Sequence, residues 1–264
     1  MSSILNRNQN LHTMKKLANK IAVVTGGSRD IGRAIAIKLA KEGADVVVNY
    51  FNTEAGALET VEEIKSLGQR AIAVKADVSN LQDIANLKEK TVAAFGDQVH
   101  ILVNNAGGLF ARKTLQEFDE SFYDLLMNVN FKSTVFVSQA FVPMMPNGSS
   151  IINLSSLAAR DGGGGGSALY SSSKGAVTTF SRAMSKELGP QGIRVNAVCP
   201  GLIGTKFHDD FTKDEIRKAV AAKTPLRKEG AAEEVADLVA YLATSESSFI
   251  TGANIDINGG LAFS

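Results

Sequence analysis

The sequence predicts one α/β domain in which helices cover both faces of a single doubly wound parallel sheet. Strand-like and helix-like segments alternate from Lys20 to the end of the 264-residue chain, and parallel strands need such crossover helices. The strand-like segments are short, nearly continuous apolar runs, as in strands that are buried on both faces. No Pro- or Ser-rich linker and no internal repeat divides residues 17–264, so we expect one domain.

The first half of the chain alternates regularly. The run Ile21–Thr25 is the first expected strand, and apolar residues from Ile31 to Leu39 recur at helical spacing until Gly43 ends that helix. Val46–Val48 is a β-branched strand, and Glu54–Leu67 is an amphipathic helix that is also followed by glycine. The next expected elements are the strand Ala71–Lys75, the helix Leu81–Phe95 and the strand Ile101–Val103.

The second half continues the rhythm with longer helices. Its expected elements are the helix Phe118–Phe141, the strand Ser150–Leu154, the helix Ala168–Leu188, the strand Arg194–Val198, a helical insertion Lys213–Ala222, the helix Glu233–Thr244 and the strand Asn254–Ile257. The polar segment 1–16 carries no acidic residue and no apolar core of a signal peptide. We expect a disordered leader there, or upstream sequence before a start at Met14.

Composition excludes several classes of function. The 28 basic and 27 acidic residues give a net charge of +1, which offers no electrostatic argument for nucleic acid or for an anionic membrane. No apolar run approaches the length of a membrane span. The single cysteine, Cys199, cannot form an internal disulfide, which favours a reducing, cytoplasmic location and a buried side chain.

A glycine-rich turn, Thr25-Gly26-Gly-Ser-Arg29-Asp30-Ile-Gly32, joins the first strand to the first helix. Glycine there lets the backbone approach a pyrophosphate, whose charge the amides and dipole of the helix N-terminus stabilise. Turns of similar kind follow the third strand, at Asp77-Val78, and the fourth, at Asn104-Asn105-Ala106-Gly107. The carboxyl ends of strands are where open α/β sheets bind ligands, so these turns predict a dinucleotide site.

The segment Tyr170-Ser-Ser-Ser-Lys174 opens a predicted helix. Tyr170 and Lys174 stand at i and i+4, on one face. A tyrosine with its ordinary pKa of about 10 is a poor acid–base catalyst at neutral pH, but a nearby ammonium lowers the pKa of the phenol. The pair is therefore a candidate for proton transfer, although the same spacing is also common in solvated surface pairs.

With these motifs the chain resembles the compact single-domain branch of the short-chain dehydrogenase/reductase family. Within that branch it is similar to 3-oxoacyl-[acyl-carrier-protein] reductases and to the sugar dehydrogenases that resemble them. The resemblance runs from about Lys20 to Gly260 and includes Thr251-Gly252 and Asn258-Gly259-Gly260. It implies a Rossmann fold, interconversion of a ketone and a secondary alcohol with NADP or NAD, and a homotetramer built through the long helices and the C-terminal region.

The resemblance also assigns site residues. The expected catalytic set is Asn130, Ser156, Tyr170 and Lys174. Tyr170 would protonate the developing alkoxide, Ser156 would polarise the substrate oxygen, Lys174 would bind the nicotinamide ribose, and Asn130 would hold a water linked to Lys174. Ser155 and Asn128 are the weaker alternatives for the serine and the asparagine. The expected cofactor-binding residues are Gly26, Ser28, Arg29, Asp30, Ile31, Gly32, Tyr50, Asp77, Val78, Asn104, Ala106, Gly107, Tyr170, Lys174, Pro200, Gly201, Ile203 and Thr205, and no metal ligands are expected.

Asp30 departs from the family fingerprint Thr-Gly-x-x-x-Gly-x-Gly, which has its middle glycine there. A carboxylate at this position could cap the helix, but it would repel a pyrophosphate at the same helix end. We expect Asp30 to point away from the phosphates or to be screened by Arg29. The segment 48–52 at the end of the second strand contains no acid for a ribose 2′-hydroxyl. Arg29 could instead meet a 2′-phosphate, which favours NADP over NAD unless Arg29 is only a solvated loop charge.

The sequence leaves the substrate open. Arg112, Lys113 and Arg160 could dock an acidic acyl carrier, whereas a sugar or uronate ketone would suit a polar substrate lid over about 204–228 with His208, Asp209 and Asp210. The five-glycine run Gly162–Gly166 is either a flexible surface loop or a border of the substrate pocket. A different class, a dinucleotide-sensing or scaffold protein without catalysis, would be expected to lack the tyrosine or the lysine, and here both are present.

Overall fold

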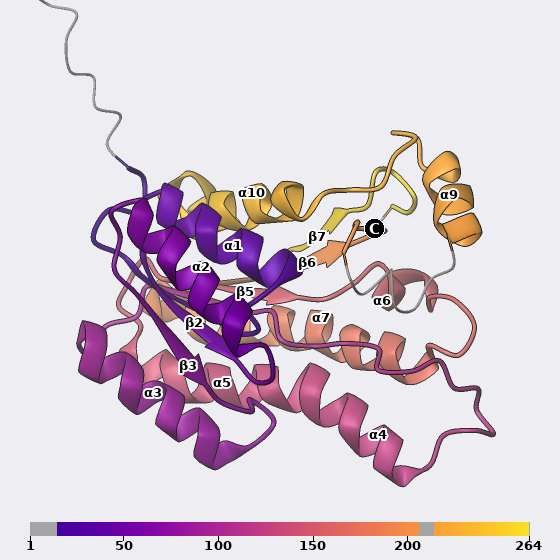
Figure 1. The fold of residues 1–264 in the computed structure, drawn as a ribbon, viewed down its shortest axis with the longest axis horizontal. Helices are drawn as coiled ribbons and strands as arrows, with labels where there is room; N and C mark the ends of the chain where they lie inside the picture. The colour runs from indigo at the N-terminus through magenta and orange to yellow at the C-terminus, as the bar shows by residue number, and fades with distance from the viewer. Residues whose placement is uncertain (1–14, 206–213, 264) are drawn as a thin grey trace, which may run out of the picture.

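The computed structural model describes residues 15–205 and 214–263, and it contains one seven-stranded sheet with helices on both faces (Figure 1). The strand order is β3-β2-β1-β4-β5-β6-β7, and the paired strands are parallel. The predicted fold class, a doubly wound parallel sheet of the Rossmann type, is confirmed. The order reverses between β1 and β4, which makes their carboxyl ends the place where such sheets bind ligands.

The elements lie close to the predicted ones. The strands are β1 (Ile21–Val24), β2 (Asp45–Tyr50), β3 (Ala71–Lys75), β4 (Ile101–Asn104), β5 (Ser150–Leu154), β6 (Arg194–Pro200) and β7 (Asn254–Ile257). The helices are α1 (Asp30–Lys41), α2 (Glu54–Ser66), α3 (Leu81–Phe95), α4 (Glu120–Met127), α5 (Ser133–Phe141), α6 (Ala158–Asp161), α7 (Ala168–Leu188), α9 (Asp214–Lys223) and α10 (Ala232–Ala243), with short 3-10 turns at Val142–Met144, Gly189–Gln191 and Ser245–Ser247.

Two apolar cores lie on the two faces of the sheet. In β1 the side chains alternate, so Ala22 and Val24 join one core while Ile21 and Val23 join the other. The first core is covered by α1, α2 and α10, and the second mainly by α3 and α5 (Figure 1). Both faces of the sheet are therefore shielded from water, which explains why the strands read as continuous apolar runs.

The predicted helix Phe118–Phe141 is one continuous helical path with an irregular centre. It begins at Glu120, after Asp119 caps it by accepting a hydrogen bond from the Phe122 amide at 2.9 Å. Its middle, Asn128–Lys132, is a π turn between α4 and α5. Such single wide turns are rare and occur often at functional sites, and this one contains Asn130.

Other differences from the sequence prediction are small. The short helix α6 was not predicted, and β6 continues to Pro200. Of the expected leader, residues 1–14 lie outside the described residues, but Lys15 and Lys16 belong to the fold, since the Lys15 ammonium donates to the Leu67 carbonyl oxygen and Lys16 pairs with Glu246 at 3.0 Å. Within the described ranges, no helix has both the length and the apolar character that crossing a membrane requires.

Candidate active site

The first turn of α7 brings Tyr170 and Lys174 to the carboxyl edge of the sheet. Lys174 is 4% exposed, and its Nζ donates a hydrogen bond to the Leu154 carbonyl oxygen at 2.8 Å. The same Nζ lies 6.0 Å from the centroid of the Tyr170 ring. The Tyr170 side chain is half-buried and hydrogen-bonded to that of Ser156. The structure thus brings three of the four predicted catalytic side chains together.

The two serines after β5 are used differently. The Ser155 hydroxyl is buried and donates to the carbonyl oxygen of Lys174 at 2.8 Å, which ties β5 to α7. The Ser156 side chain is half-buried, accepts from the Ala158 amide at 3.1 Å and reaches Tyr170. Ser155 thus bonds backbone and Ser156 is the serine that reaches Tyr170, and the catalytic role of Ser156 stays a prediction.

Asn130 completes the set from the π turn. It is fully buried, and its amide pairs with the backbone of Gly108: Oδ1 accepts from the Gly108 amide at 2.8 Å and Nδ2 donates to the Gly108 carbonyl at 2.9 Å. Next to it, a Cβ placed on Gly107 would lie 2.6 Å from Asn130 Oδ1 and 2.9 Å from Lys174 Nζ. The turn after β4 therefore packs directly against both side chains.

Burial controls the protonation of this site. It lowers the pKa of Lys174 from its ordinary 10.5 to about 8, because a buried ammonium loses its hydration. It raises the pKa of the Tyr170 phenol, and the hydrogen bond from Ser156 opposes that rise. We expected Lys174 to lower the pKa of Tyr170, but burial has the larger effect, and the opposing contribution comes from Ser156.

The glycine-rich turn after β1 is built to hold the backbone close to a ligand. A Cβ on Gly32 would lie 2.0 Å from the carbonyl oxygen of Gly26, so no other residue fits there. The Asn105 amide donates to the carbonyl oxygens of Thr25 and Gly26 at 3.0 and 3.1 Å, and Asn49 Oδ1 accepts from the Gly26 amide at 3.2 Å. Neither Asn49 nor Asn105 was among the site residues expected from the sequence. The sequence pattern that could have identified them is a polar side chain at the end of a buried strand.

Asp30 occupies the first position of α1 with a φ of +51°. This is the left-handed region, which favours glycine and which aspartate and asparagine tolerate better than other residues. The Arg29 guanidinium lies 3.6 Å from the Asp30 carboxylate, in keeping with the expected screening. The left-handed backbone therefore explains why the family fingerprint has glycine at this position. Aspartate is among the residues best able to replace it.

Comparisons with known proteins agree with this geometry. A family model described as Enoyl-(Acyl carrier protein) reductase matches residues 26–262. An uncharacterized oxidoreductase of Methylorubrum extorquens is 40% identical over 250 residues, which cover 94% of this chain and 100% of that protein. A hydroxynaphthalene reductase-like protein of Metarhizium majus is 36% identical, covering 94% of this chain and 97% of the relative. A crystal structure of a short-chain dehydrogenase from Burkholderia cenocepacia in complex with NADP superposes with a TM-score of 0.86 at 35% identity, covering 93% of this chain and 99% of that one.

The chain belongs to the short-chain dehydrogenase/reductase family. It is an oxidoreductase of that family, dependent on a nicotinamide dinucleotide. The residues present fit such a cofactor. Gly26 and Gly32 lie in close contact, and neither has a side chain to cover the backbone at the N-terminus of α1. The side chain of the N-cap residue Arg29 does not bond the helix amides, which leaves them available to a pyrophosphate. The Asp30 carboxylate is the one feature at that helix end that opposes a pyrophosphate.

At the expected adenosine end of this dehydrogenase/reductase, the side chains are largely engaged. The Tyr50 hydroxyl donates to Glu54 Oε1 at 3.0 Å, so a carboxylate from α2 does lie beside the end of β2. Asp77 Oδ1 accepts from the Ser79 amide and hydroxyl at 2.9 and 2.7 Å. Val78 is buried in the second core.

The Asn104 side chain lies inside the fold, and its predicted contact with the cofactor stays a prediction. Its side chain is buried, and Nδ2 donates to Ser138 Oγ at 3.0 Å and to Asn153 Oδ1 at 2.8 Å. Among the described residues no donor reaches its Oδ1. The side chain therefore joins a polar network under the sheet edge, whereas Ala106 is partly buried and Gly107 is exposed.

The predicted nicotinamide contacts follow β6. Ile203 and Thr205 are mostly buried, and Ile203 forms an isolated bridge with Gly230. Of the expected lid over 204–228, residues 206–213 lie outside the described residues, and with them His208, Asp209 and Asp210. In the described ranges, no group of three or more His, Cys, Asp or Glu side chains could hold a metal ion.

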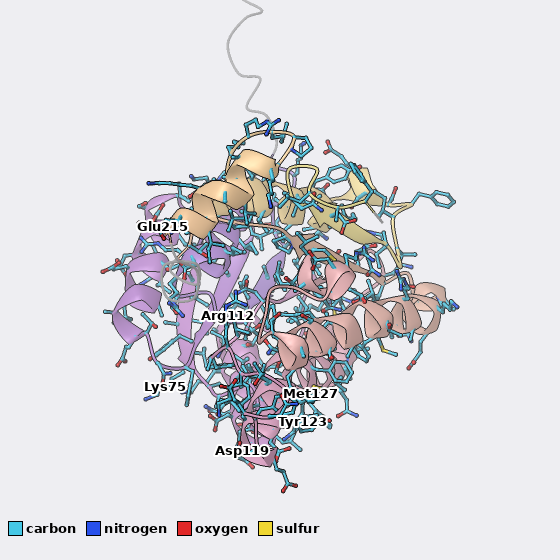
Figure 2. All side chains as sticks on the ribbon, turned by 90° about the vertical axis from the view of Figure 1, so that its right-hand side faces the viewer. Lys75, Arg112, Asp119, Tyr123, Met127 and Glu215 are labelled. Carbon is cyan, nitrogen blue, oxygen red and sulfur yellow. The ribbon has the colours of Figure 1, made fainter. Side chains whose placement is uncertain are left out.

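The glycine run Gly162–Gly166 is largely exposed, but hydrogen bonds fix its backbone. The Arg112 guanidinium donates to the Gly165 carbonyl at 3.0 Å, and the Lys113 amide donates to the Gly166 carbonyl at 3.0 Å. Hydroxyls of Ser167 and Ser171 bond further carbonyls of the run. The run is thus held against the segment after β4, and Figure 2 places Arg112 near the centre of the molecular face that carries α9.

The basic cluster considered for an acidic carrier does not form as predicted. Arg160 is 17% exposed and pairs with Asp256, so it is not available for docking. The Lys113 ammonium lies 4.6 Å from the centroid of the Phe122 ring. Only Arg112 of the three is an exposed side chain.

Proposed function

We propose that this enzyme reduces a ketone to a secondary alcohol, and catalyses the reverse oxidation, with Tyr170 as the proton donor. The observation that supports the proposal is the convergence of Tyr170, Ser156 and Lys174 at the carboxyl edge of β5. A hydroxyl, a phenol and a buried ammonium side by side are the groups needed to bind, polarise and protonate a carbonyl oxygen.

The chain's own residues divide the work. When bound, a reduced nicotinamide supplies a hydride to the carbonyl carbon. Tyr170 gives its proton to the substrate oxygen, and the Ser156 hydroxyl donates a hydrogen bond that stabilises the negative charge growing there. The Lys174 ammonium, fixed by the Leu154 carbonyl, stabilises the phenolate that remains on Tyr170, and we expect it also to bind the nicotinamide ribose.

Asn130 shapes the site in this scheme. Its side-chain amide is engaged with Gly108 on both sides, so a water that relays protons to Lys174 would bind the Asn130 backbone carbonyl instead. The π turn supports that use, because its wider hydrogen-bonding pattern loosens the backbone contacts of the turn.

For the cofactor we propose NADP over NAD. Arg29 is half exposed at the start of α1 and carries the charge that a 2′-phosphate needs, and the relative from Burkholderia cenocepacia binds NADP. Glu54 beside Tyr50 is the opposing feature, since a carboxylate there could accept from a ribose 2′-hydroxyl. A higher kcat/KM with NADPH than with NADH, reduced by Arg29→Ala, would support the proposal; a preference for NADH would overturn it.

For the substrate we propose a 3-oxoacyl thioester as the first candidate, in line with the acyl-carrier description of the matching family model. A sugar or uronate ketone is the alternative. The test is a panel of 3-oxoacyl thioesters, sugar and uronate ketones and hydroxynaphthalene-type ketones, each with NADPH and NADH. Dinucleotide binding without turnover on the whole panel would instead favour an inactive sensing or scaffold protein.

We also propose that the chain assembles as a homotetramer and works in the cytoplasm. Exposed apolar side chains on α4, such as Tyr123 and Leu125, and near the C-terminus, Phe249 and Phe263, support assembly through the regions predicted from the family. Light scattering on the purified enzyme gives the mass; a monomer would contradict the proposal.

A further inference from the structure

We propose that Arg160 is a positioning residue for Ser156, acting through an ion pair with Asp256 that ties α6 to the edge strand β7. The inference rests on the proposed function, in which Ser156 contacts the substrate oxygen. Arg160 itself lies away from that oxygen, in the helix that follows the serine.

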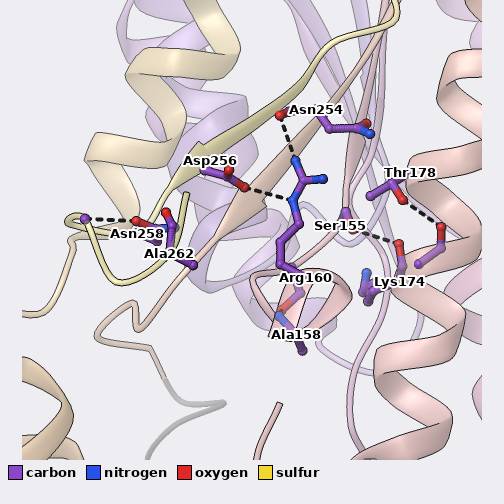
Figure 3. A network of polar contacts seen from close by, with 12 residues as sticks. Ser155, Ala158, Arg160, Lys174, Thr178, Asn254, Asp256, Asn258 and Ala262 are labelled. Atoms are coloured by element: carbon purple, nitrogen blue, oxygen red, sulfur yellow. Dashed lines mark hydrogen bonds and ion pairs between the residues drawn. The ribbon is translucent and has the colours of Figure 1, made fainter. Parts of the chain in front are cut away.

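The Arg160 guanidinium contacts the edge strand β7 at two residues. Arg160 Nε lies 3.1 Å from Asp256 Oδ1, and Nη2 donates to the Asn254 carbonyl at 2.9 Å (Figure 3). Both charged side chains are largely buried, with 17% and 13% of their surface exposed. The planar fork of arginine suits such a two-point contact, which a lysine cannot reproduce in full.

Backbone and side-chain hydrogen bonds connect Arg160 to Ser156. The Leu157 amide donates to the Pro200 carbonyl at 2.8 Å, and the Arg160 amide donates to the Leu157 carbonyl at 2.8 Å. The Ala158 amide donates to Ser156 Oγ at 3.1 Å. A shift of α6 would therefore move the hydroxyl that bonds Tyr170.

Apolar burial contributes little to the position of α6. It has four residues, none of which is buried, and a helix this short has no stability of its own. On its far side the chain runs into the glycine segment Gly162–Gly166. Polar contacts therefore do most of the holding: the Leu157 amide bonds the Pro200 carbonyl, the Ser171 hydroxyl bonds the Gly162 carbonyl, and the Arg160 guanidinium joins the turn to β7.

Stability of the sheet is a weak explanation for the ion pair. β7 is already joined to β6 by a parallel ladder from Ala197↔Asn254 to Pro200↔Ile257. The attraction within a buried ion pair is largely offset by the loss of hydration of both charges. We therefore assign its main contribution to the turn that carries Ser156, where it adds a link to β7 beside the bond from the Leu157 amide to the Pro200 carbonyl.

The test compares variants of the full-length enzyme. Arg160→Met should lower kcat about tenfold, as small displacements of a reacting group do, while KM for NADPH stays within about twofold. Arg160→Lys, which keeps the charge and one contact, should recover part of the loss. If Arg160→Met does not fold, Asp256→Asn removes the partner's charge without changing its shape and should lower kcat in the same way.

Arg182→Met is the matched control. With the Asn254 amide oriented to accept, Arg182 on α7 donates to its oxygen at 2.8 and 3.0 Å, so this variant also removes an arginine that holds β7. It does not touch α6, and kcat should stay within about twofold of wild type. An equal fall in kcat for Arg182→Met would overturn the inference, since any loosening of β7 would then suffice.

A double-mutant cycle with Ser156→Ala decides how Arg160 acts. If it acts through Ser156, Arg160→Met should lower kcat by less than about twofold in the Ser156→Ala background, measured with enzyme in excess. The same loss in both backgrounds, or no loss in either, would overturn the inference alone. Full activity of Ser156→Ala would overturn the proposed role of the serine and the inference with it.

Discussion

Asn130 pairs with both the amide and the carbonyl group of Gly108, at 2.8 and 2.9 Å. This contact fixes the turn after β4 against the π turn, and it leaves Gly107 wedged between the Asn130 amide and the Lys174 ammonium. A Cβ on Gly107 would lie 2.6 and 2.9 Å from those two groups, closer than real Cβ contacts come.

Gly107→Ala should therefore lower kcat by at least about tenfold, because either Lys174 or Asn130 must move. The matched variant is Gly108→Ala, whose Cβ would meet only ring atoms of Phe110 at 3.6 to 3.9 Å, and it should lose far less. Steady-state kinetics of the two variants, with circular dichroism to verify folding, check this. Equal losses would show that the space around Gly107 is not critical.

Asp30→Gly should tighten NADPH binding severalfold, because it removes a negative charge from the helix end expected to hold the pyrophosphate. Its effect on unfolding should be small, about 1 kcal/mol or less, since relief of the left-handed backbone is offset by the greater freedom of glycine in the unfolded chain.

Asp30→Asn separates charge from backbone, since asparagine tolerates the φ of +51° but is neutral. We expect it to bind NADPH as tightly as Asp30→Gly does, by fluorescence titration. An unchanged affinity in both variants would mean that the carboxylate does not weaken binding.

The rate of ketone reduction should fall as pH rises through about 8, the pKa of Lys174. Lys174 is charged below that pH and loses its proton above it, while burial keeps the pKa of Tyr170 raised and the phenol protonated. A kcat/KM profile from pH 6 to about 10 checks this. A limb well below pH 8 would indicate instead a tyrosine with a strongly lowered pKa.

Lys174→Met should stabilise the fold while it inactivates the enzyme. Below about pH 8 lysine is charged in both the folded and the unfolded chain, so the folded state bears the full cost of the buried ammonium. We expect Lys174→Met to raise the free energy of unfolding at neutral pH by roughly 1 to 3 kcal/mol, after the lost bond to Leu154 is subtracted.

The gain in stability of Lys174→Met should depend on pH. Between about 8 and 10.5 the unfolded chain holds the proton longer than the folded one, so wild-type stability at this site rises with pH and the advantage of Lys174→Met shrinks. Urea unfolding of both proteins at pH 7 and near pH 10 measures it. A variant less stable than wild type at pH 7 would contradict the account.

Sequence periodicity predicted the strands well, because a strand buried on both faces is a simple apolar run. Ile21, Ala22, Val23 and Val24 show why: all four are buried, and they serve two cores in alternation. The π turn at Asn128–Lys132 was not predictable in this way, since one wide turn changes no apolar spacing that a short window detects. The short helix α6 escaped for a related reason, as it buries no side chain.

In the candidate site, too, some residues could be predicted from local sequence and others could not. Residues of one motif, such as Tyr170 and Lys174, could be placed from their spacing alone. Partners from distant segments could not, and so Arg160 was taken for a docking residue although it pairs with Asp256 across the fold. Asn105 was passed over because its role, bonding the carbonyls of Thr25 and Gly26, depends on the register of β1 and β4.

The Tyr170→Phe variant measures whether Tyr170 transfers the proton. The variant keeps the ring and loses only the hydroxyl that bonds Ser156. We predict that kcat for ketone reduction falls by about 10³-fold, within the range of general acid catalysis, while the Kd for NADPH changes by less than about threefold. A Tyr170→Phe enzyme that retains more than about a tenth of the wild-type kcat would contradict the account.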